Sequence, residues 1–177
     1  MELDNVIARR RSVRCFQAKP VAKADIEAMI QSAIFAPSWK NLQTTRYAVV
    51  MDQERLAQVK ACLPAFNQEN VKDAPVLIVT SFVKDMVGFN KQQEAVNELG
   101  NGWGCYDCGL HNMQMILKAT QLGLGTLIMG IRDGAMLHQV LDIPDDQQIV
   151  SVIAVGYYDK EIEMPKRKTI AEITRFY

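Results

Sequence analysis

The longest helical pattern in this chain runs from about residue 105 to residue 122. Leu110, Met113, Leu117 and Thr120 recur every three or four residues and so fall on one stripe of an α-helix. Gly123 follows directly, and glycine is the residue type that most often ends a helix. We therefore expect one long helix at the centre of the fold.

Shorter elements are expected before and after this helix. Helical patterns are found at 3–9, 23–35, 55–63 and 134–141. Strand patterns, rich in apolar and β-branched residues, are found at 47–51, 75–83, 124–129 and 149–157. Because these elements do not alternate in a strict βαβ repeat, they favour an α+β fold, or a mixed sheet flanked by helices, over a doubly wound parallel sheet.

Length and composition fit a single domain over residues 1–177. The chain has 177 residues, of which 49% are hydrophobic, and this is enough for a sizeable core. It carries 20 basic and 20 acidic residues, so it lacks the broad cationic surface that nucleic-acid binding requires. Its start does not resemble a signal peptide, and its apolar stretches are too short to span a bilayer. We expect a cytoplasmic protein that binds neither nucleic acid nor membranes, with its four cysteines reduced.

Two groups of glycines invite a search for phosphate-binding loops, and neither group fits one. The glycines lie at positions 100, 102 and 104 and at positions 123, 125 and 130. A dinucleotide fingerprint would need further glycines where Cys105 and Ile128 stand, and no P-loop sequence occurs. A bound phosphate would therefore depend mainly on side chains.

The segment RRSVRCF at 10–16 offers such side chains. If it is extended, Arg10, Ser12 and Arg14 project to one side, while Arg11 and Val13 face the other. Two guanidinium groups and a hydroxyl on one face suit a phosphate monoester or the polar edge of a ring. The alternative is an ordinary basic strand in contact with solvent.

The loop APSWKNLQTTRY at 36–47 is a second unusual segment. Pro37 fixes a turn, and Ser38, Asn41 and Gln43 offer neutral hydrogen-bonding groups just before a strand. These groups could read the edge of a heterocycle. Alternatively, the loop is a polar connection whose side chains cap backbone groups.

Four blocks taken together resemble the nitroreductase family of FMN-dependent oxidoreductases. They are RRSVRCF at 10–16, APSWKNLQ at 36–43, DCGLHNMQMILKATQLGLGT at 107–126 and PKRK at 165–168. The resemblance implies an α+β fold in which helices flank a mixed, mainly antiparallel sheet. It also implies a homodimer whose interface contains the long central helix and whose FMN sites lie between the subunits.

The resemblance also implies roles for individual residues. The flavin and its phosphate would be held from one subunit by Arg10, Ser12 and Arg14, with help from Arg11 and from Arg167 or Lys168. The partner subunit would cover the dimethylbenzene side or the ring edge with a loop that contains Pro37, Ser38, Trp39, Asn41 and Gln43. The pyrimidine and N5 of the flavin would be reached by Asn67 and by the backbone of Met129 and Gly130.

The implied reaction is ping-pong. NADH or NADPH would pass a hydride to flavin N5, and a nitroaromatic, a quinone or a similar acceptor would then take it. A cation near the N1 and C2 carbonyl edge, such as Arg14, would favour the anionic reduced flavin. No side-chain general acid is needed, so we expect no obligatory catalytic residue. The sequence departs from the family pattern in two places. Thr44-Thr45 stands where many members have Pro-Trp, a change that bears on the packing of the loop, and the segment 87–103 is short for a large lid over the substrate face.

Cys105, Cys108 and His111 share a helical face and form the remaining candidate site. Three ligands on one helix leave a zinc site incomplete, and buried cysteine often packs as a small apolar residue. We therefore expect no metal. The alternatives to a nitroreductase-like enzyme are a specialised flavoenzyme of the same fold, such as a dehalogenase, a flavin-binding redox sensor, and a flavin-free thiol oxidoreductase that uses the two cysteines.

Overall fold

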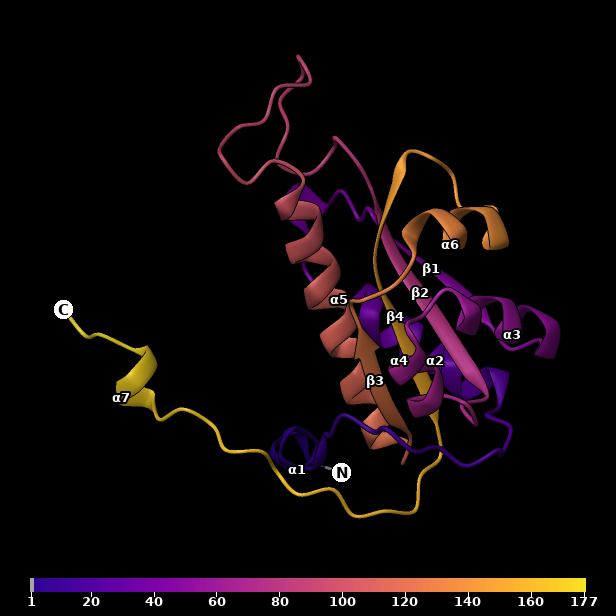
Figure 1. Cartoon of the computed structure of the whole chain (residues 1–177). Helices are drawn as coiled ribbons and strands as arrows, with labels where there is room; N and C mark the ends of the chain where they lie inside the picture. Colours follow the sequence, from indigo (N-terminus) through magenta and orange to yellow (C-terminus); the bar gives the residue numbers. More distant parts are fainter. Residues whose placement is uncertain (1) are drawn as a thin grey trace.

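The computed structural model describes residues 2–177 and has an antiparallel sheet at its centre (Figure 1). Its four strands lie in the order β1-β2-β4-β3. Their bounds are β1 Thr45–Val50, β2 Val76–Val83, β3 Gly125–Met129 and β4 Gln147–Gly156. The seven α-helices are α1 Leu3–Arg9, α2 Lys23–Ile34, α3 Gln53–Ala61, α4 Ala65–Asn70, α5 Gly102–Gln121, α6 Gly134–Leu141 and α7 Ile170–Ile173. The predicted α+β fold is confirmed.

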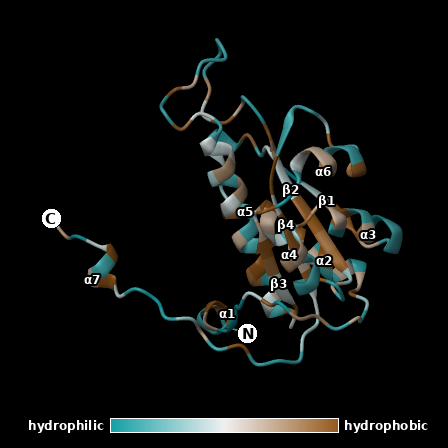
Figure 2. Ribbon diagram, in the orientation of Figure 1, coloured by the Kyte–Doolittle hydropathy of each residue, from teal (hydrophilic) through white to brown (hydrophobic). Residues whose placement is uncertain are grey.

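The two central strands are covered on both faces. Along β2 and β4, nearly every side chain between Val76 and Phe82 and between Ser151 and Val155 is buried. A strand buried on both faces reads as a continuous apolar run, and this is why both strands could be recognised from the sequence. Figure 2 shows these strands as a hydrophobic centre with more hydrophilic helix surfaces around it.

Each face of the sheet has its own hydrophobic core. On one face, Leu77 and Val152 pack with Leu56 of α3 and Leu137 of α6. On the other face, α2 and α5 pack against each other and against the sheet. That second core contains Ile26, Met29, Ala33, Val76, Ile78, Met115, Ile116, Ala119, Ile153 and Val155. The long helix is therefore part of the core, as the sequence predicted.

The buried face of α5 is not the stripe that the sequence pattern marks. The inward residues of its first half are mainly polar or small and include Asp107, His111 and Asn112. Asn112 Nδ2 donates to Thr80 Oγ1 at 3.3 Å, so polar groups meet between α5 and β2. The marked stripe lies outside, where Met113 is 42% exposed. α5 thus keeps a stripe that the described part of the chain covers only in part, with Leu110 and Leu117 half-buried.

Two segments extend away from the body in Figure 1. One is the connection at 84–101, which enters α5 through reciprocal hydrogen bonds between Asp85 and Asn101. The other is the C-terminal arm, residues 163–177, in which every side chain is exposed. No helix within residues 2–177 combines the length and the apolar character that a membrane crossing requires.

Candidate functional site

The arginine-rich segment runs beside the beginning of β3. Ser12 forms a parallel bridge with Thr126, and the Val13 amide donates to the Thr126 carbonyl oxygen at 2.9 Å. Val13 is buried in the core, whereas Arg14 is exposed. The segment is therefore extended, with Val13 on the inner side and Arg14 on the outer side, as the alternation of its residues predicted.

Arg11 is tied to the backbone. Its guanidinium donates to the carbonyl oxygens of Ala8 at 2.6 Å, of Arg10 at 2.9 Å and of Ile162 at 2.9 Å. These bonds fasten the end of α1 to the beginning of the C-terminal segment. Arg11 consequently has fewer donors left for a ligand than its neighbours, and its role at a flavin stays a prediction.

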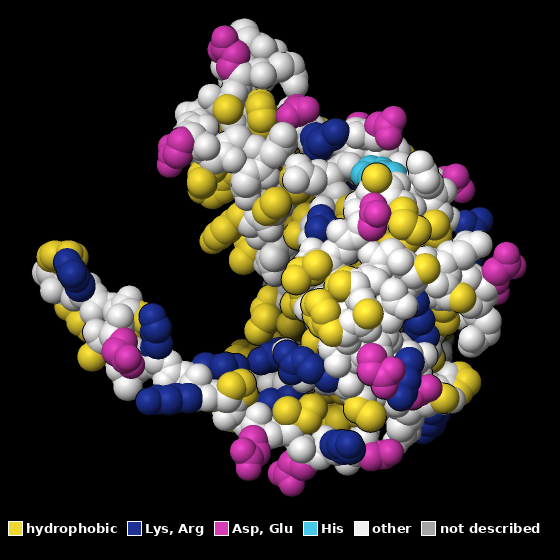
Figure 3. Space-filling model, viewed as in Figure 1, with side chains coloured by type: hydrophobic (Ala, Val, Ile, Leu, Met, Phe, Trp, Pro, Cys, Tyr) yellow, Lys and Arg dark blue, Asp and Glu magenta, His cyan; other side chains and the backbone are white. Residues whose placement is uncertain are grey.

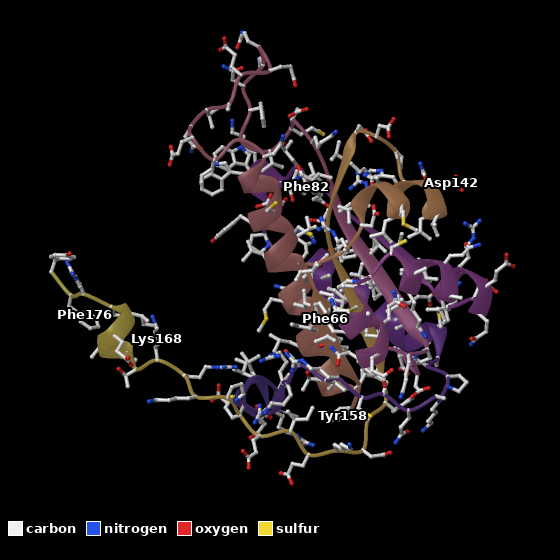
Figure 4. All side chains as sticks on the ribbon, viewed as in Figure 1. Phe66, Phe82, Asp142, Tyr158, Lys168 and Phe176 are labelled. Atoms are coloured by element: carbon white, nitrogen blue, oxygen red, sulfur yellow. The ribbon has the colours of Figure 1, made fainter. Side chains whose placement is uncertain are left out.

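Arg10 lies near Arg167 of the C-terminal arm. Partial burial lowers the pKa of the Arg10 guanidinium, and the positive charges of Arg167 and Arg11 lower it further. The ion pairs within residues 2–177 join lysine and glutamate side chains elsewhere, so these arginines have no carboxylate partner there. Guanidinium groups gathered without a counter-charge favour the binding of an anion. Lys168 follows Arg167 and lies on the arm, away from the body (Figure 4).

The loop between α2 and β1 has an unusual backbone. Lys40, Asn41 and Gln43 have φ values of 47°, 58° and 51°, which place three non-glycine residues in the left-handed region. Each non-glycine residue in this region costs conformational free energy. Such residues persist where surrounding contacts hold them, often at ligand-binding sites. The hydroxyl of Ser38 closes this loop by accepting a hydrogen bond from the Gln43 amide at 3.1 Å.

The same loop is fastened to the beginning of α5. The Trp39 amide donates to Asp107 Oδ2 at 2.8 Å, and the Trp39 ring lies 4.8 Å from the Trp103 ring, centroid to centroid. Trp103 in turn contacts Tyr106 at 5.7 Å in an edge-to-face arrangement, and its indole N–H donates to Asn97 Oδ1 at 2.9 Å. Trp103 therefore contacts both the loop at 37–43 and the protruding segment at 84–101.

The remaining predicted positions lie on α4 and at the end of β3. Asn67 is buried in α4. Met129 is buried in the core, whereas Gly130 is exposed, with open space where a side chain would stand. Because β3 begins beside Ser12 and ends at Met129, one short strand connects the arginine-rich segment with this glycine.

The structure does not bring the two main parts of the predicted site together within one chain. Trp39 is bound at Asp107, near the beginning of α5, whereas Ser12 lies beside Thr126, just beyond the end of α5. At 1.5 Å per residue, the helix from Asp107 to Gln121 spans about 21 Å. A ligand that contacts the arginine-rich segment of one chain would therefore meet the 37–43 loop most readily from a second chain.

The two cysteines of α5 have different surroundings. Cys105 is exposed and Cys108 is buried. Burial raises the pKa of both thiols, that of Cys108 to about 11, which disfavours the thiolate that redox chemistry and metal binding require. His111 is buried, and its burial lowers the pKa of the imidazole. Within residues 2–177, no group of three or more His, Cys, Asp or Glu side chains is placed to hold a metal ion.

Asp107 is not among the site residues predicted from the sequence, although the sequence contains a signal for it. A carboxylate inside a helical pattern, on the face that turns towards the core, needs a hydrogen-bond donor. Here that donor is the backbone of the 37–43 loop. Trp103 was also overlooked as the residue that joins two loops, because its contacts depend on segments distant in the sequence.

Comparison with known proteins agrees with this architecture. The family model described as the nitroreductase family matches residues 7–66 and 57–157. A nitroreductase family protein of known structure from Streptococcus pneumoniae superposes with a TM-score of 0.88 at 24% identity, covering 99% of this chain and 100% of that one. The FMN reductase [NAD(P)H] of Bacillus subtilis is 25% identical over 93% of this chain and 70% of its own length. An iodotyrosine deiodinase of Nematostella vectensis is 26% identical over 93% of this chain and 71% of its own length.

The family match covers most of the chain, and it includes three of the four sequence blocks from which the resemblance was inferred. The structural match extends the likeness to nearly the whole length of both chains. The chain therefore belongs to the nitroreductase family.

Proposed function

We propose that this protein is an FMN-dependent oxidoreductase that takes reducing equivalents from NADH or NADPH and passes them to a nitroaromatic, a quinone or a similar small acceptor. Family membership and the likeness to a protein named FMN reductase [NAD(P)H] support the reaction class. The observation that carries the proposal is that the positive charge of Arg167 acts on Arg10, while neither guanidinium forms an ion pair with a carboxylate within residues 2–177. A location in the cytoplasm stays a prediction.

The residues present fit FMN. Its phosphate would be held by Arg10 and Arg167, with Ser12 beside them as a neutral donor. Arg14 is exposed on the same extended segment; its guanidinium donates one hydrogen bond, to the Ser12 carbonyl oxygen at 3.4 Å, and its other donors could meet the pyrimidine edge of a ring. The open space over Gly130 lets a planar group approach the backbone at the end of β3. Bound FMN would supply the redox chemistry, by accepting and donating two electrons.

The chain's own residues would bind and orient FMN, and they would not transfer protons. The positive charge of Arg14 beside the ring would stabilise negative charge that develops there. That no side-chain general acid is needed, and that no residue is obligatory for catalysis, stays a prediction. Substitution of Arg10, Arg14 or Arg167 should therefore act mainly through retention of FMN.

A homodimer completes the site in this proposal. The outer stripe of α5 leaves Leu110 and Leu117 half-buried and Met113 exposed, as is typical of a helix that packs on a second subunit. The C-terminal arm carries five large exposed hydrophobic side chains: Met164, Ile170, Ile173, Phe176 and Tyr177. Figure 3 shows a hollow between the arm and the body, lined by hydrophobic side chains with Lys and Arg at its base. A second copy of the chain seated there would cover these surfaces.

The test uses the full-length protein purified from cells. We expect it to be yellow, to elute as a dimer, and to lose its visible flavin absorbance when NADH or NADPH is added without oxygen. Addition of a quinone or a nitroaromatic should then restore the absorbance. A colourless protein that does not take up added FMN would refute the proposal. Bleaching followed by reoxidation with release of halide from a halogenated phenol, and not by a quinone, would instead assign the protein to dehalogenation.

A further inference from the structure

The 37–43 loop is held in a strained shape by a small number of contacts. Three of its seven residues have left-handed backbone conformations without being glycine. Within the loop, Ser38 Oγ accepts from the Gln43 amide, and Gln43 Nε2 donates to Asn41 Oδ1 at 3.1 Å. These bonds close the loop on itself, but they do not fix where it lies on the protein. The contacts that fix its position come from α5.

Asp107 supplies the polar contact between α5 and the loop. Its side chain is only 3% exposed, and within residues 2–177 its carboxylate accepts one hydrogen bond, from the Trp39 amide at 2.8 Å. Trp39 is the first residue of a single turn of 3-10 helix, Trp39–Asn41. The N-cap residue of this turn is Ser38, and its side chain forms no capping hydrogen bond. Asp107 thus satisfies the free amide at the beginning of this turn from a different element.

The surroundings of Asp107 indicate that this bond is its role. No cationic side chain forms an ion pair with it among the described residues. Burial lowers the pKa of the neighbouring His111, and the negative charge of Asp107 offsets this only in part. A buried carboxylate without a counter-charge is costly, and a protein gains from it only where it makes a strong hydrogen bond. The charge-assisted bond to the Trp39 amide is of that kind.

We propose that Asp107 is a positioning residue for the cofactor site: it holds Trp39, and through Trp39 the 37–43 loop, in the position that completes the FMN site of the partner subunit. This inference rests on the proposed function. The aromatic contact between Trp39 and Trp103 fixes the side-chain end of the same residue, so the amide and the ring of Trp39 are both held by the first turns of α5.

The experiment compares two variants of the full-length dimer with the wild type. Asp107→Ala removes the acceptor, whereas Asp107→Asn keeps an oxygen that can accept the same bond without charge. We expect FMN to bind Asp107→Ala roughly tenfold more weakly or worse, because a bond from a buried amide to a charged group is lost. We expect Asp107→Asn to bind FMN within about threefold of the wild type, since a neutral bond keeps the geometry. The visible spectrum of the bound flavin should shift in the alanine variant and return in the asparagine variant.

Ser81→Ala is the matched control. Ser81 is as buried as Asp107, and its side chain donates to Gln147 Oε1 at 2.7 Å; within residues 2–177 that side chain forms no hydrogen bond with the 37–43 loop. A general loss of stability would affect both alanine variants alike, whereas the proposal predicts weak FMN binding for Asp107→Ala alone. If Asp107→Ala fails to fold, Asp107→Ser, whose hydroxyl is too short to reach the Trp39 amide, takes its place.

Two results would overturn the proposal, and they are distinguishable. If the wild type binds FMN and Asp107→Ala binds it equally tightly with an unchanged spectrum, Asp107 does not position the loop, and the proposed function stands. If the wild type itself does not bind FMN, the proposed function fails, and this inference fails with it.

Discussion

Lys40 shows how a single backbone angle bears on stability. Its φ of 47° is unfavourable for any side chain that has a Cβ atom, and its own side chain is exposed. Lys40→Gly should therefore raise the free energy of unfolding by about 0.5–1 kcal/mol, because the left-handed cost of roughly 1–2 kcal/mol is partly offset by the greater freedom of glycine in the unfolded chain. Urea denaturation measures this difference.

Lys40→Ala is the control for that prediction. Alanine removes the same charge and the same long side chain but keeps the Cβ atom, so it should leave the free energy of unfolding close to that of the wild type. If glycine and alanine had the same effect, the backbone conformation of Lys40 would not be the cause. The sequence alone could not reveal this strain, because lysine is not a residue type that indicates a left-handed angle.

At the scale of elements, Gly104 determines how closely α5 approaches the sheet. A Cβ atom at this position would lie 2.3 Å from ring atoms of Phe82, a distance that real structures do not tolerate. Figure 4 labels Phe82 near the beginning of α5. Gly104→Ala should destabilise the protein by about 1–3 kcal/mol, since the ring or the helix must shift. Thermal or urea unfolding of the purified variant measures the loss.

The double variant Gly104→Ala with Phe82→Leu separates close packing from helix propensity. Leucine lacks the ring atoms that the new methyl group would meet, so the double variant should lose less stability than the sum of the two single changes. An additive result would contradict the close contact. Alanine has a higher helix propensity than glycine, so propensity alone would make Gly104→Ala stabilising. A loss of stability must therefore come from the close contact with Phe82.

Long, strongly patterned elements could be predicted from the sequence, and short ones could not. The four predicted strands match β1 to β4, because an apolar run such as 76–83 is typical of a buried strand. Their ends agree within about two residues, which is the usual uncertainty in the ends of an element. α4 was not predicted: it has six residues, and its exposed Phe66 breaks any apolar stripe. α7 was not predicted either, although Thr169 and Glu172 form a capping box that is visible in the sequence.

The candidate site was predictable to the extent that it depends on local chemistry. The extended conformation of residues 10–14 was predicted from the alternation of their side chains. That Arg10 and Arg167 act on each other was expected from the family resemblance. The anchoring of the 37–43 loop by Asp107 depends on residues 68 positions apart in the chain. Such a contact leaves no local pattern, so the structure was needed to find it.

At the scale of the whole molecule, the length of α5 separates the two parts of the proposed site. The Asp107 anchor and the arginine-rich segment lie at opposite ends of that helix, about 21 Å apart along it. If each FMN site takes its arginines from one subunit and its 37–43 loop from the other, two differently damaged subunits should repair each other. Arg14→Ala damages the first part and Asp107→Ala the second, and we expect either homodimer to bind FMN weakly.

A heterodimer of these two variants should regain one intact site. The Asp107→Ala subunit keeps its arginines, and the Arg14→Ala subunit keeps its loop anchor, so together they form one complete site and one site with both defects. Co-expression with two different affinity tags isolates the heterodimer, and FMN titration should show tight binding to half of its sites. The control heterodimer joins Arg10→Ala with Arg14→Ala, in which both sites stay damaged. Weak binding by both heterodimers would mean that the loop and the arginines serve the same subunit, and the separation along α5 would then have to be bridged within one chain.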